Sequence, residues 1–109
     1  MTEPLLIRHG DLEIDLARYR VLRGQEPIML SYREYALLVY LATHPGHVVT
    51  KRRLLEEGMG RHDAGGLLMV DEHVRHLKAK LERHHELLIE KLEDGYRFLV
   101  PQPSGRDVT

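Results

Sequence analysis

The spacing of apolar residues changes at Ser31, and this change restricts the fold more than any other feature of the sequence. Before it, apolar and charged residues alternate, as in residues 12–16, with the period of two that is typical of half-buried strands. Turns at Gly10 and at 23–25 separate the alternating runs. We therefore predict an antiparallel meander of four short strands, the last over 27–30, followed by helices.

Three helices are predicted after Ser31, because apolar residues then recur at three and four positions. Ser31 and Glu34 have the spacing of a capping box, which places the start of the first helix. Thr50 is expected to cap a short second helix over 51–57. The third helix, over 67–84, is the longest and the most amphipathic. Its predicted core-facing residues are Leu67, Val70, Val74, Leu77 and Leu81.

A β-hairpin is predicted near the C-terminal end. Residues 93–95 separate two apolar runs, and an Asp-Gly pair in such a position is a strong turn signal. Residues 48–49 are expected to form a brief extended link between the first two helices. The chain is thus predicted to be a single α+β domain over 1–100, with a flexible tail over 101–109.

The composition excludes several classes of function. Because cysteine is absent, the chain has no disulfide, thiolate zinc site, iron–sulfur cluster or cysteine nucleophile. No apolar run approaches the roughly 18 residues of a membrane span, so we expect a cytoplasmic protein with no membrane partner. No phosphate-binding glycine loop, nucleophile elbow or zinc-protease motif occurs, and we expect neither an enzyme nor a bound cofactor.

Charge is nearly balanced over the whole chain, with 16 Lys and Arg residues against 17 Asp and Glu, so nucleic-acid binding must depend on local charge. The segment 51–85 is the cationic third, with eight Lys or Arg residues, six Asp or Glu and five histidines. Residues 51–53 begin the second helix, where the helix dipole disfavours cations. Binding of phosphates would explain why three cations occur there. The alternative is that they pair with the acidic residues 56–57 of the same helix.

Four segments resemble, in order and spacing, the motifs of one protein family. They are LSYREYALL at 30–38, HPGHVVTKRRLL at 44–55, VDEHVRHLKAKL at 70–81 and GYRF at 95–98. Residues 5–100 are similar to the C-terminal DNA-binding domain of OmpR/PhoB-type response regulators. This resemblance implies a winged helix-turn-helix, with an N-terminal four-stranded antiparallel sheet, three helices and a C-terminal hairpin wing.

The resemblance also implies that the domain binds duplex DNA to regulate transcription. The helix over 67–84 would enter the major groove, and the hairpin would rest on the neighbouring minor groove or backbone. Arg75 is the best candidate for a base-edge contact, because its planar fork matches guanine O6 and N7. An ordinary solvated helix face is the alternative. The candidate DNA-binding residues are Lys51, Arg52, Arg53, Glu72, His73, Arg75, His76, Lys78, Lys80, Tyr96 and Arg97.

The family places a phosphoacceptor receiver domain upstream, and these 109 residues do not contain one. The resemblance therefore implies either a piece of a longer regulator or control by a separate receiver or sensor protein. That protein, or RNA polymerase, would bind through the loop over 58–66. A homodimer on DNA is a further partner arrangement that the resemblance implies.

Some residues depart from the family pattern and keep a second function open. Leu68 and Met69 replace a basic and a hydroxyl residue at the start of the third helix, and Glu72 replaces an apolar one. The wing turn, Glu93-Asp94, is acidic where the family has a basic residue. These changes favour, as the alternative, a degenerate winged helix that acts as a protein-interaction module with weak or no DNA binding.

The third helix carries a candidate surface metal site. His73 and His76 lie three positions apart beside Glu72, with residues 84–85 two turns further on. Solvated histidines explain the pattern better, and we expect no metal.

Overall fold

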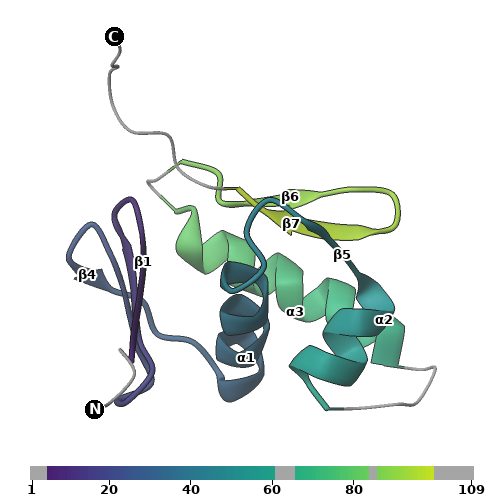
Figure 1. The fold of residues 1–109 in the computed structure, drawn as a ribbon, viewed down its shortest axis with the longest axis horizontal. Helices are drawn as coiled ribbons and strands as arrows, with labels where there is room; N and C mark the ends of the chain where they lie inside the picture. The colour runs from purple at the N-terminus through teal and green to yellow at the C-terminus, as the bar shows by residue number, and fades with distance from the viewer. Residues whose placement is uncertain (1–4, 61–65, 84–85, 100–109) are drawn as a thin grey trace, which may run out of the picture.

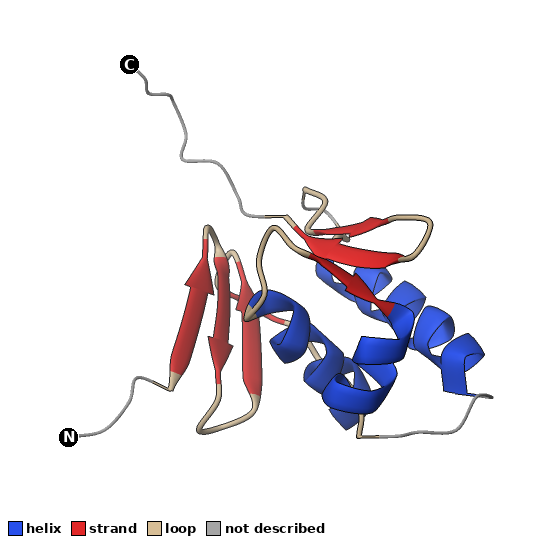
Figure 2. Ribbon diagram, turned by 45° about the vertical axis from the view of Figure 1, so that its right-hand side comes forward, coloured by secondary structure: helices blue, strands red, loops and turns tan. Residues whose placement is uncertain are grey.

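The computed structural model describes residues 5–60, 66–83 and 86–99. Figure 1 and Figure 2 show an N-terminal sheet, a central group of helices, and a second sheet that contains the C-terminal hairpin. The helices thus lie between two short sheets. The expected tail over 101–109 and most of the loop over 58–66 fall outside the described residues.

The N-terminal sheet is an antiparallel meander in the order β1-β2-β3-β4. Its strands are β1 (Leu6–His9), β2 (Leu12–Asp15), β3 (Arg20–Arg23) and β4 (Glu26–Pro27). The prediction of a fourth strand over 27–30 was therefore wrong in position. Gly24 and Gln25 adopt positive φ values of 58° and 72° and form a two-residue turn, which twists in the sense of the strands it joins. Pairing accordingly begins with Glu26 opposite Arg23 and ends at Pro27.

Helix α1 (Tyr32–Ala42) begins at the predicted capping box. The Ser31 hydroxyl accepts from the Glu34 backbone N–H at 3.2 Å, and the Glu34 carboxylate accepts from the Ser31 N–H at 3.0 Å. The spacing of apolar residues predicts a buried stripe on this helix, made of Tyr35, Leu38, Val39, Leu41 and Ala42. Leu37 lies outside that stripe and is nevertheless fully buried. The apolar face is wider than expected because the second helical segment covers it.

The second helical segment starts as α2 (Lys51–Arg53) and continues as a wider, π-type turn, η1 (Leu54–Gly58). Thr50 caps it as predicted, since its hydroxyl accepts from the Arg53 N–H at 3.1 Å. The predicted helix over 51–57 is therefore present and ends one residue later than expected.

Helix α3 (Gly66–Leu81) carries the predicted apolar stripe. Its fully buried apolar residues are Val70, Val74, Leu77 and Leu81. The predicted range of 67–84 was wrong at its end, because the helix stops at Leu81. The Glu82 carboxylate accepts from the backbone N–H groups of Leu88 and Ile89 at 2.8 and 2.9 Å. The Glu82 side chain thus holds residues 88–89 next to the end of α3. A longer helix would move Glu82 away from these residues.

The second sheet has the order β5-β7-β6. Its strands are β5 (Val48–Thr50), β6 (Ile89–Lys91) and β7 (Gly95–Phe98). Residues 48–49 are extended, as predicted, and β5 in addition pairs with β7 and places Val49 opposite Tyr96. The hairpin is thereby extended to a three-stranded sheet that is attached to the start of α2.

Gly95 lies against the backbone of β5. A Cβ atom at this position would be 2.0 Å from the Val49 carbonyl oxygen and 2.8 Å from Thr50 Cα. The hairpin turn itself consists of Glu93 and Asp94, and Leu92 donates to the Gly95 carbonyl at 2.8 Å. The Asp-Gly pair therefore located the hairpin correctly, but the glycine is needed for the close approach of two strands.

Arg23 is buried and connects the N-terminal sheet to α3. Its side chain has 4% of its area exposed, its Nε donates to Asp11 Oδ1 at 3.0 Å, and its Nη1 donates to the Leu81 carbonyl at 2.9 Å. Leu81 is the last residue of α3, and a cation at the C-terminal end of a helix is favoured by the helix dipole. Arg23 thus fixes one end of α3 on β3.

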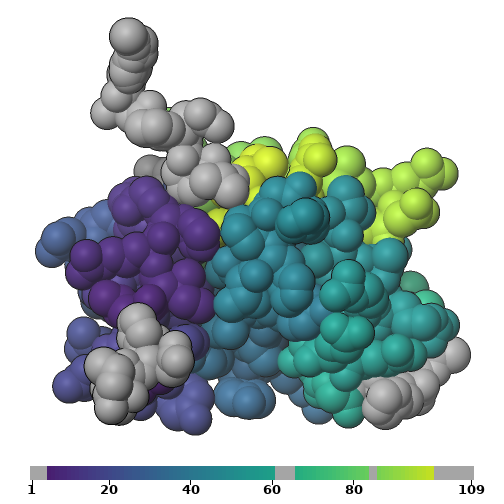
Figure 3. Space-filling view, in the orientation of Figure 1, coloured from purple at the N-terminus to yellow at the C-terminus, as the bar shows by residue number. Residues whose placement is uncertain are grey.

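The four-stranded sheet, the helices and the C-terminal hairpin form the predicted winged helix-turn-helix. In the space-filling view the hairpin projects at the upper right, while the N-terminal sheet lies at the opposite side of the molecule (Figure 3). The surface between α3 and the hairpin is the one on which the sequence places most candidate residues.

Candidate nucleic-acid interface

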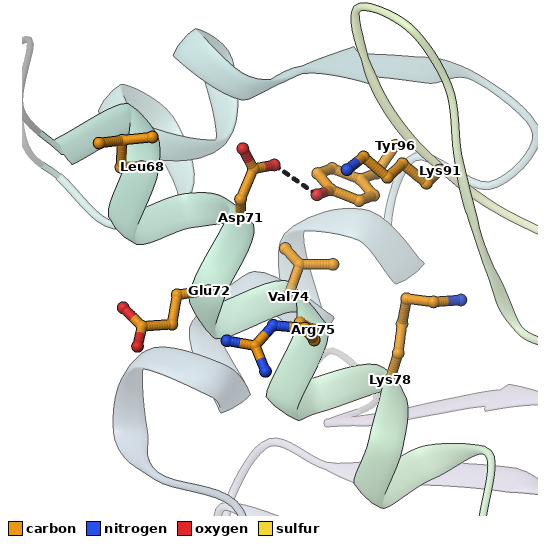
Figure 4. A pocket seen from close by; sticks show the side chains of 8 residues that line it. All are labelled: Leu68, Asp71, Glu72, Val74, Arg75, Lys78, Lys91 and Tyr96. Carbon is orange, nitrogen blue, oxygen red and sulfur yellow. Dashed lines mark hydrogen bonds between the residues drawn. The ribbon is translucent and has the colours of Figure 1, made fainter.

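A groove of about 380 Å³ lies between α3 and the hairpin. It is lined by Leu68, Asp71, Glu72, Val74, Arg75 and Lys78 of α3 and by Lys91 and Tyr96 of the hairpin (Figure 4). Five of these eight residues are ionisable acids or bases with full charges at neutral pH. Charged side chains of both α3 and the hairpin therefore border the groove.

Lys51, Asp71 and Tyr96 join three elements at one side of this groove. The Lys51 ammonium donates to Asp71 Oδ2 at 2.9 Å, and the Tyr96 hydroxyl donates to Asp71 Oδ1 at 2.5 Å. Tyr96 is buried, with 2% of its area exposed. Two predicted DNA-binding residues, Lys51 and Tyr96, thus hold α2, α3 and β7 together through Asp71.

These contacts shift the pKa values of the group. Partial burial raises the pKa of the Asp71 carboxyl, but the hydrogen bonds from Tyr96 and Lys51 outweigh burial, and the pKa lies below its ordinary value. Burial, together with the hydrogen bond to the Asp71 carboxylate, raises the pKa of the Tyr96 hydroxyl well above its usual range. Asp71 is therefore ionised and Tyr96 protonated at neutral pH.

Asp71→Asn is expected to lower the free energy of unfolding at pH 7 by about 1–2 kcal/mol, because the bond from Lys51 loses its charge. Asp71 has a lower pKa in the folded state than in the unfolded state, so its ionised form stabilises the fold above about pH 4. That contribution disappears as the pH falls through the folded pKa. Urea unfolding at pH 7 and at pH 3 should show a smaller loss of stability on acidification for Asp71→Asn than for the unmodified protein. An equal loss in both would contradict this role, and Asp94→Asn in the exposed turn is the control.

Arg75 and Glu72 point outward from α3 (Figure 4). Neither side chain makes a hydrogen bond or an ion pair with another described residue. Leu68, one turn before Glu72, is 80% exposed. At about 100° of rotation per residue these three side chains lie within roughly 60° of one another around the helix axis. Helix α3 therefore presents an apolar, an acidic and a basic side chain in one row.

Lys91 was missed by the sequence analysis. It is exposed on β6, it lies opposite Tyr96 in the hairpin register, and its side chain lines the groove across from α3 (Figure 4). Its charge also helps to lower the pKa of Asp71. A two-residue turn at 93–94 pairs positions 91 and 96 on one face, and this register was the signal that could have identified Lys91.

Two predicted cations of α3 are engaged within the protein. Lys78 donates to both carboxylate oxygens of Glu82, at 3.1 and 3.3 Å, and to the Ile89 carbonyl. It lines the groove at the base of the hairpin. Lys80 donates to Glu34 Oε1 at 2.7 Å and does not line the groove. Lys80 therefore binds α1 and lies outside the groove.

The two arginines of α2 make pairs within their own helical segment. Arg52 lies 3.3 Å from Glu56, and Arg53 lies 3.5 Å from Glu57. Arg53 also donates to the Tyr40 hydroxyl at 2.8 Å. Because these side chains are exposed, the two pairs contribute little to stability. Each arginine can therefore leave its glutamate and bind another anion.

The remaining candidate residues do not line the groove. His73 Nδ1 is 2.8 Å from the Met69 carbonyl, and His76 is exposed. Arg97 pairs with Glu90 across the hairpin at 2.6 Å. Among residues 5–60, 66–83 and 86–99, no three His, Cys, Asp or Glu side chains are placed to hold a metal ion. None of the helices in these ranges has the length and apolar character to cross a membrane.

The sequence of this chain is similar to a known protein family. Residues 24–98 match the family described as transcriptional regulatory protein, C terminal. The chain belongs to this family. Among curated relatives of the transcriptional-regulator C-terminal family, SrrA of Staphylococcus aureus is 40% identical over 99 residues. The match covers 87% of this chain and 41% of SrrA, so the chain spans less than half the length of such relatives.

Solved structures of this family share the fold. The RstA DNA-binding domain of Klebsiella pneumoniae, crystallised with the RstA box, is 29% identical with a TM-score of 0.77, over 88% of this chain and 98% of that one. DrrB of Thermotoga maritima, an OmpR/PhoB homologue, is 28% identical with a TM-score of 0.76, over 87% of this chain and 44% of that one. The predicted OmpR/PhoB-type winged helix is thus confirmed.

Three residues near the start of α3, Leu68, Met69 and Glu72, differ from the family pattern. Met69 is half-buried and its sulfur contacts the Arg33 guanidinium at 3.1 Å, so it is turned toward α1. Leu68 and Glu72 instead line the groove. Within this OmpR/PhoB-type domain, the exposed departures on α3 are therefore limited, among the described residues, to these two positions.

Proposed function

We propose that this chain is the DNA-binding domain of a transcriptional regulator and that it binds duplex DNA sequence-specifically with α3 and the hairpin. The observation that carries the proposal is the placement of Arg75. Its guanidinium is exposed and has no partner among the described residues, on a helix fixed by Arg23 at one end and by Asp71 near the other. A donor held in this way can contact a base edge without reorganisation of the protein.

The other candidate residues take separate roles in this proposal. Arg75 donates to guanine in the major groove, and Lys91 and Arg52 contact phosphates on either side of α3. Lys51 and Tyr96 position α3 through Asp71, and Lys78 holds the base of the hairpin. The crystal structure of RstA with the RstA box supports duplex DNA as the ligand of this surface. With duplex DNA as its ligand, we expect the domain to act in the cytoplasm.

Further partners are also proposals. The loop over 58–66 is the surface that we assign to RNA polymerase or to a receiver or sensor protein. A homodimer on a two-part DNA site is the expected oligomeric form, because palindromic half-sites mirror a two-fold protein.

Arg75→Ala is expected to weaken binding to the preferred duplex by about 5- to 150-fold, which corresponds to the roughly 1–3 kcal/mol of a bidentate base contact. The variant should also lose sequence preference at one base pair. Binding of labelled duplexes, measured by fluorescence anisotropy at fixed salt, tests both effects. Lys80→Ala removes the same kind of charge from α3, but outside the groove, and should change affinity by less than about threefold. Equal effects of the two substitutions would contradict the assigned face.

Glu93→Arg is expected to raise affinity for every duplex, because the turn of the hairpin would then carry a cation toward the DNA backbone. One added phosphate contact should steepen the log–log salt slope by roughly 0.9. Glu13→Arg on β2, at the far side of the molecule, is the matched control (Figure 1). A salt slope that Glu93→Arg leaves unchanged would show that the hairpin does not reach DNA.

A further inference from the structure

We infer that Glu72 makes the domain select a cytosine at a base pair adjacent to the one that Arg75 contacts. This inference rests on the proposed function and adds the identity of a second base that the site reads. We argue it from the row of exposed side chains on α3, Leu68, Glu72 and Arg75, and from the groove beside that row.

Of the two acids that line the groove, Glu72 is the one that no described residue engages. The groove lining contains two carboxylates, and Asp71 is engaged by Lys51 and Tyr96. Glu72 is exposed, has no partner among the described residues, and points away from the protein (Figure 4). It stands one turn after Leu68 and three residues before Arg75, so it faces the same ligand as Arg75.

The chemistry of an ionised carboxylate then restricts which base can lie opposite. A carboxylate only accepts hydrogen bonds. In the major groove guanine presents two acceptors and thymine one acceptor, whereas cytosine presents the N4 amine donor. Adenine presents a donor with the N7 acceptor next to it, which repels the second carboxylate oxygen. Cytosine is therefore the base that satisfies Glu72 best.

The spacing along α3 places this base near the one that Arg75 reads. Glu72 and Arg75 are separated by roughly 4.5 Å along the helix axis at 1.5 Å per residue. Base pairs follow one another every 3.4 Å or so along a strand. The two side chains consequently contact neighbouring base pairs, one through an acceptor and the other through donors.

A carboxylate on this surface also repels phosphates, so it lowers affinity for all sequences unless a base compensates. Opposite an acceptor base the charge loses water and gains no partner, which is unfavourable. Glu72 thus raises specificity mainly by penalising sites that lack cytosine.

The test is selection from a duplex library with a randomised core, followed by affinity measurements on single-base variants of the selected duplex. The unmodified protein should prefer cytosine at one position by about tenfold, the effect of roughly 1.4 kcal/mol. Glu72→Gln should shift that preference to adenine, because an amide matches adenine N6 and N7. Arg75→Ala should flatten a neighbouring position and leave the cytosine preference in place.

The outcomes separate this inference from the proposed function. A uniform rise in affinity of Glu72→Gln for all duplexes would mean that Glu72 only repels phosphates, and would overturn the inference while DNA binding stands. A change at the same position that Arg75→Ala flattens would mean that Glu72 only orients Arg75, and would also overturn it. Failure of the unmodified protein to bind any duplex would overturn the proposed function itself. Glu13→Gln, which removes a charge from β2, should leave every base preference unchanged.

Discussion

Gly95→Ala is expected to lower the free energy of unfolding by about 3 kcal/mol or more, the upper range for insertion of a group into a packed site. The added Cβ would lie 2.0 Å from the Val49 carbonyl oxygen, so β5 must move away from β7. That movement breaks the pairing that attaches the hairpin to α2, and DNA affinity should fall together with stability. Urea unfolding followed by far-UV circular dichroism measures the first effect.

Gly58→Ala is the matched control for Gly95→Ala. A Cβ at Gly58 would have ordinary contacts of 3.5 Å and 3.7 Å with Tyr40, and the residue has no positive φ. Its substitution should leave stability unchanged or raise it by about 0.4–1 kcal/mol, because alanine has less freedom in the unfolded chain. A Gly95→Ala protein as stable as Gly58→Ala would show that β5 and β7 are not in such close contact.

Arg23→Met is the second substitution for which a large effect is expected, a loss of about 2–4 kcal/mol. Methionine retains much of the buried volume, but the Leu81 carbonyl loses its charged donor at the end of α3. Thermal and urea unfolding should show the loss, and hydrogen exchange should show earlier opening at the C-terminal end of α3. Arg20→Met, at an exposed position on the same strand, should cost less than about 0.5 kcal/mol. Equal stability of the two variants would show that Arg23 does not stabilise α3.

The parts of the fold that depend on local sequence could be predicted. The alternation before Ser31, the capping box at Ser31 and Glu34, and the stripe on α3 each act within a few residues, and the structure contains all three. The pairing of β5 with β7 could not be predicted, because it joins segments that are distant in the chain. The end of α3 depends on Glu82 and on Arg23, which act through contacts with other elements.

The candidate site was predictable in its location but not in the roles of its residues. The exposed face of α3 and the position of Arg75 follow from helical periodicity. The engagement of Lys80 with Glu34 and of Lys51 with Asp71 joins different helices, and no local pattern indicates it. Lys91 reaches the groove through the hairpin register. The sequence thus identifies the candidate DNA-binding cations. Contacts between distant segments decide which of these cations remain available to bind DNA.

The salt dependence of duplex binding tests the central claim most directly. Affinity for one labelled duplex is measured from about 50 to 200 mM salt, and its logarithm is plotted against the logarithm of salt concentration. Contacts from Lys91 and Arg52 to phosphates predict a slope of about −1.8 or steeper, at roughly −0.9 for each phosphate neutralised. A slope near zero, or no binding at 50 mM salt, would contradict DNA binding by α3 and the hairpin and would favour a protein-interaction module.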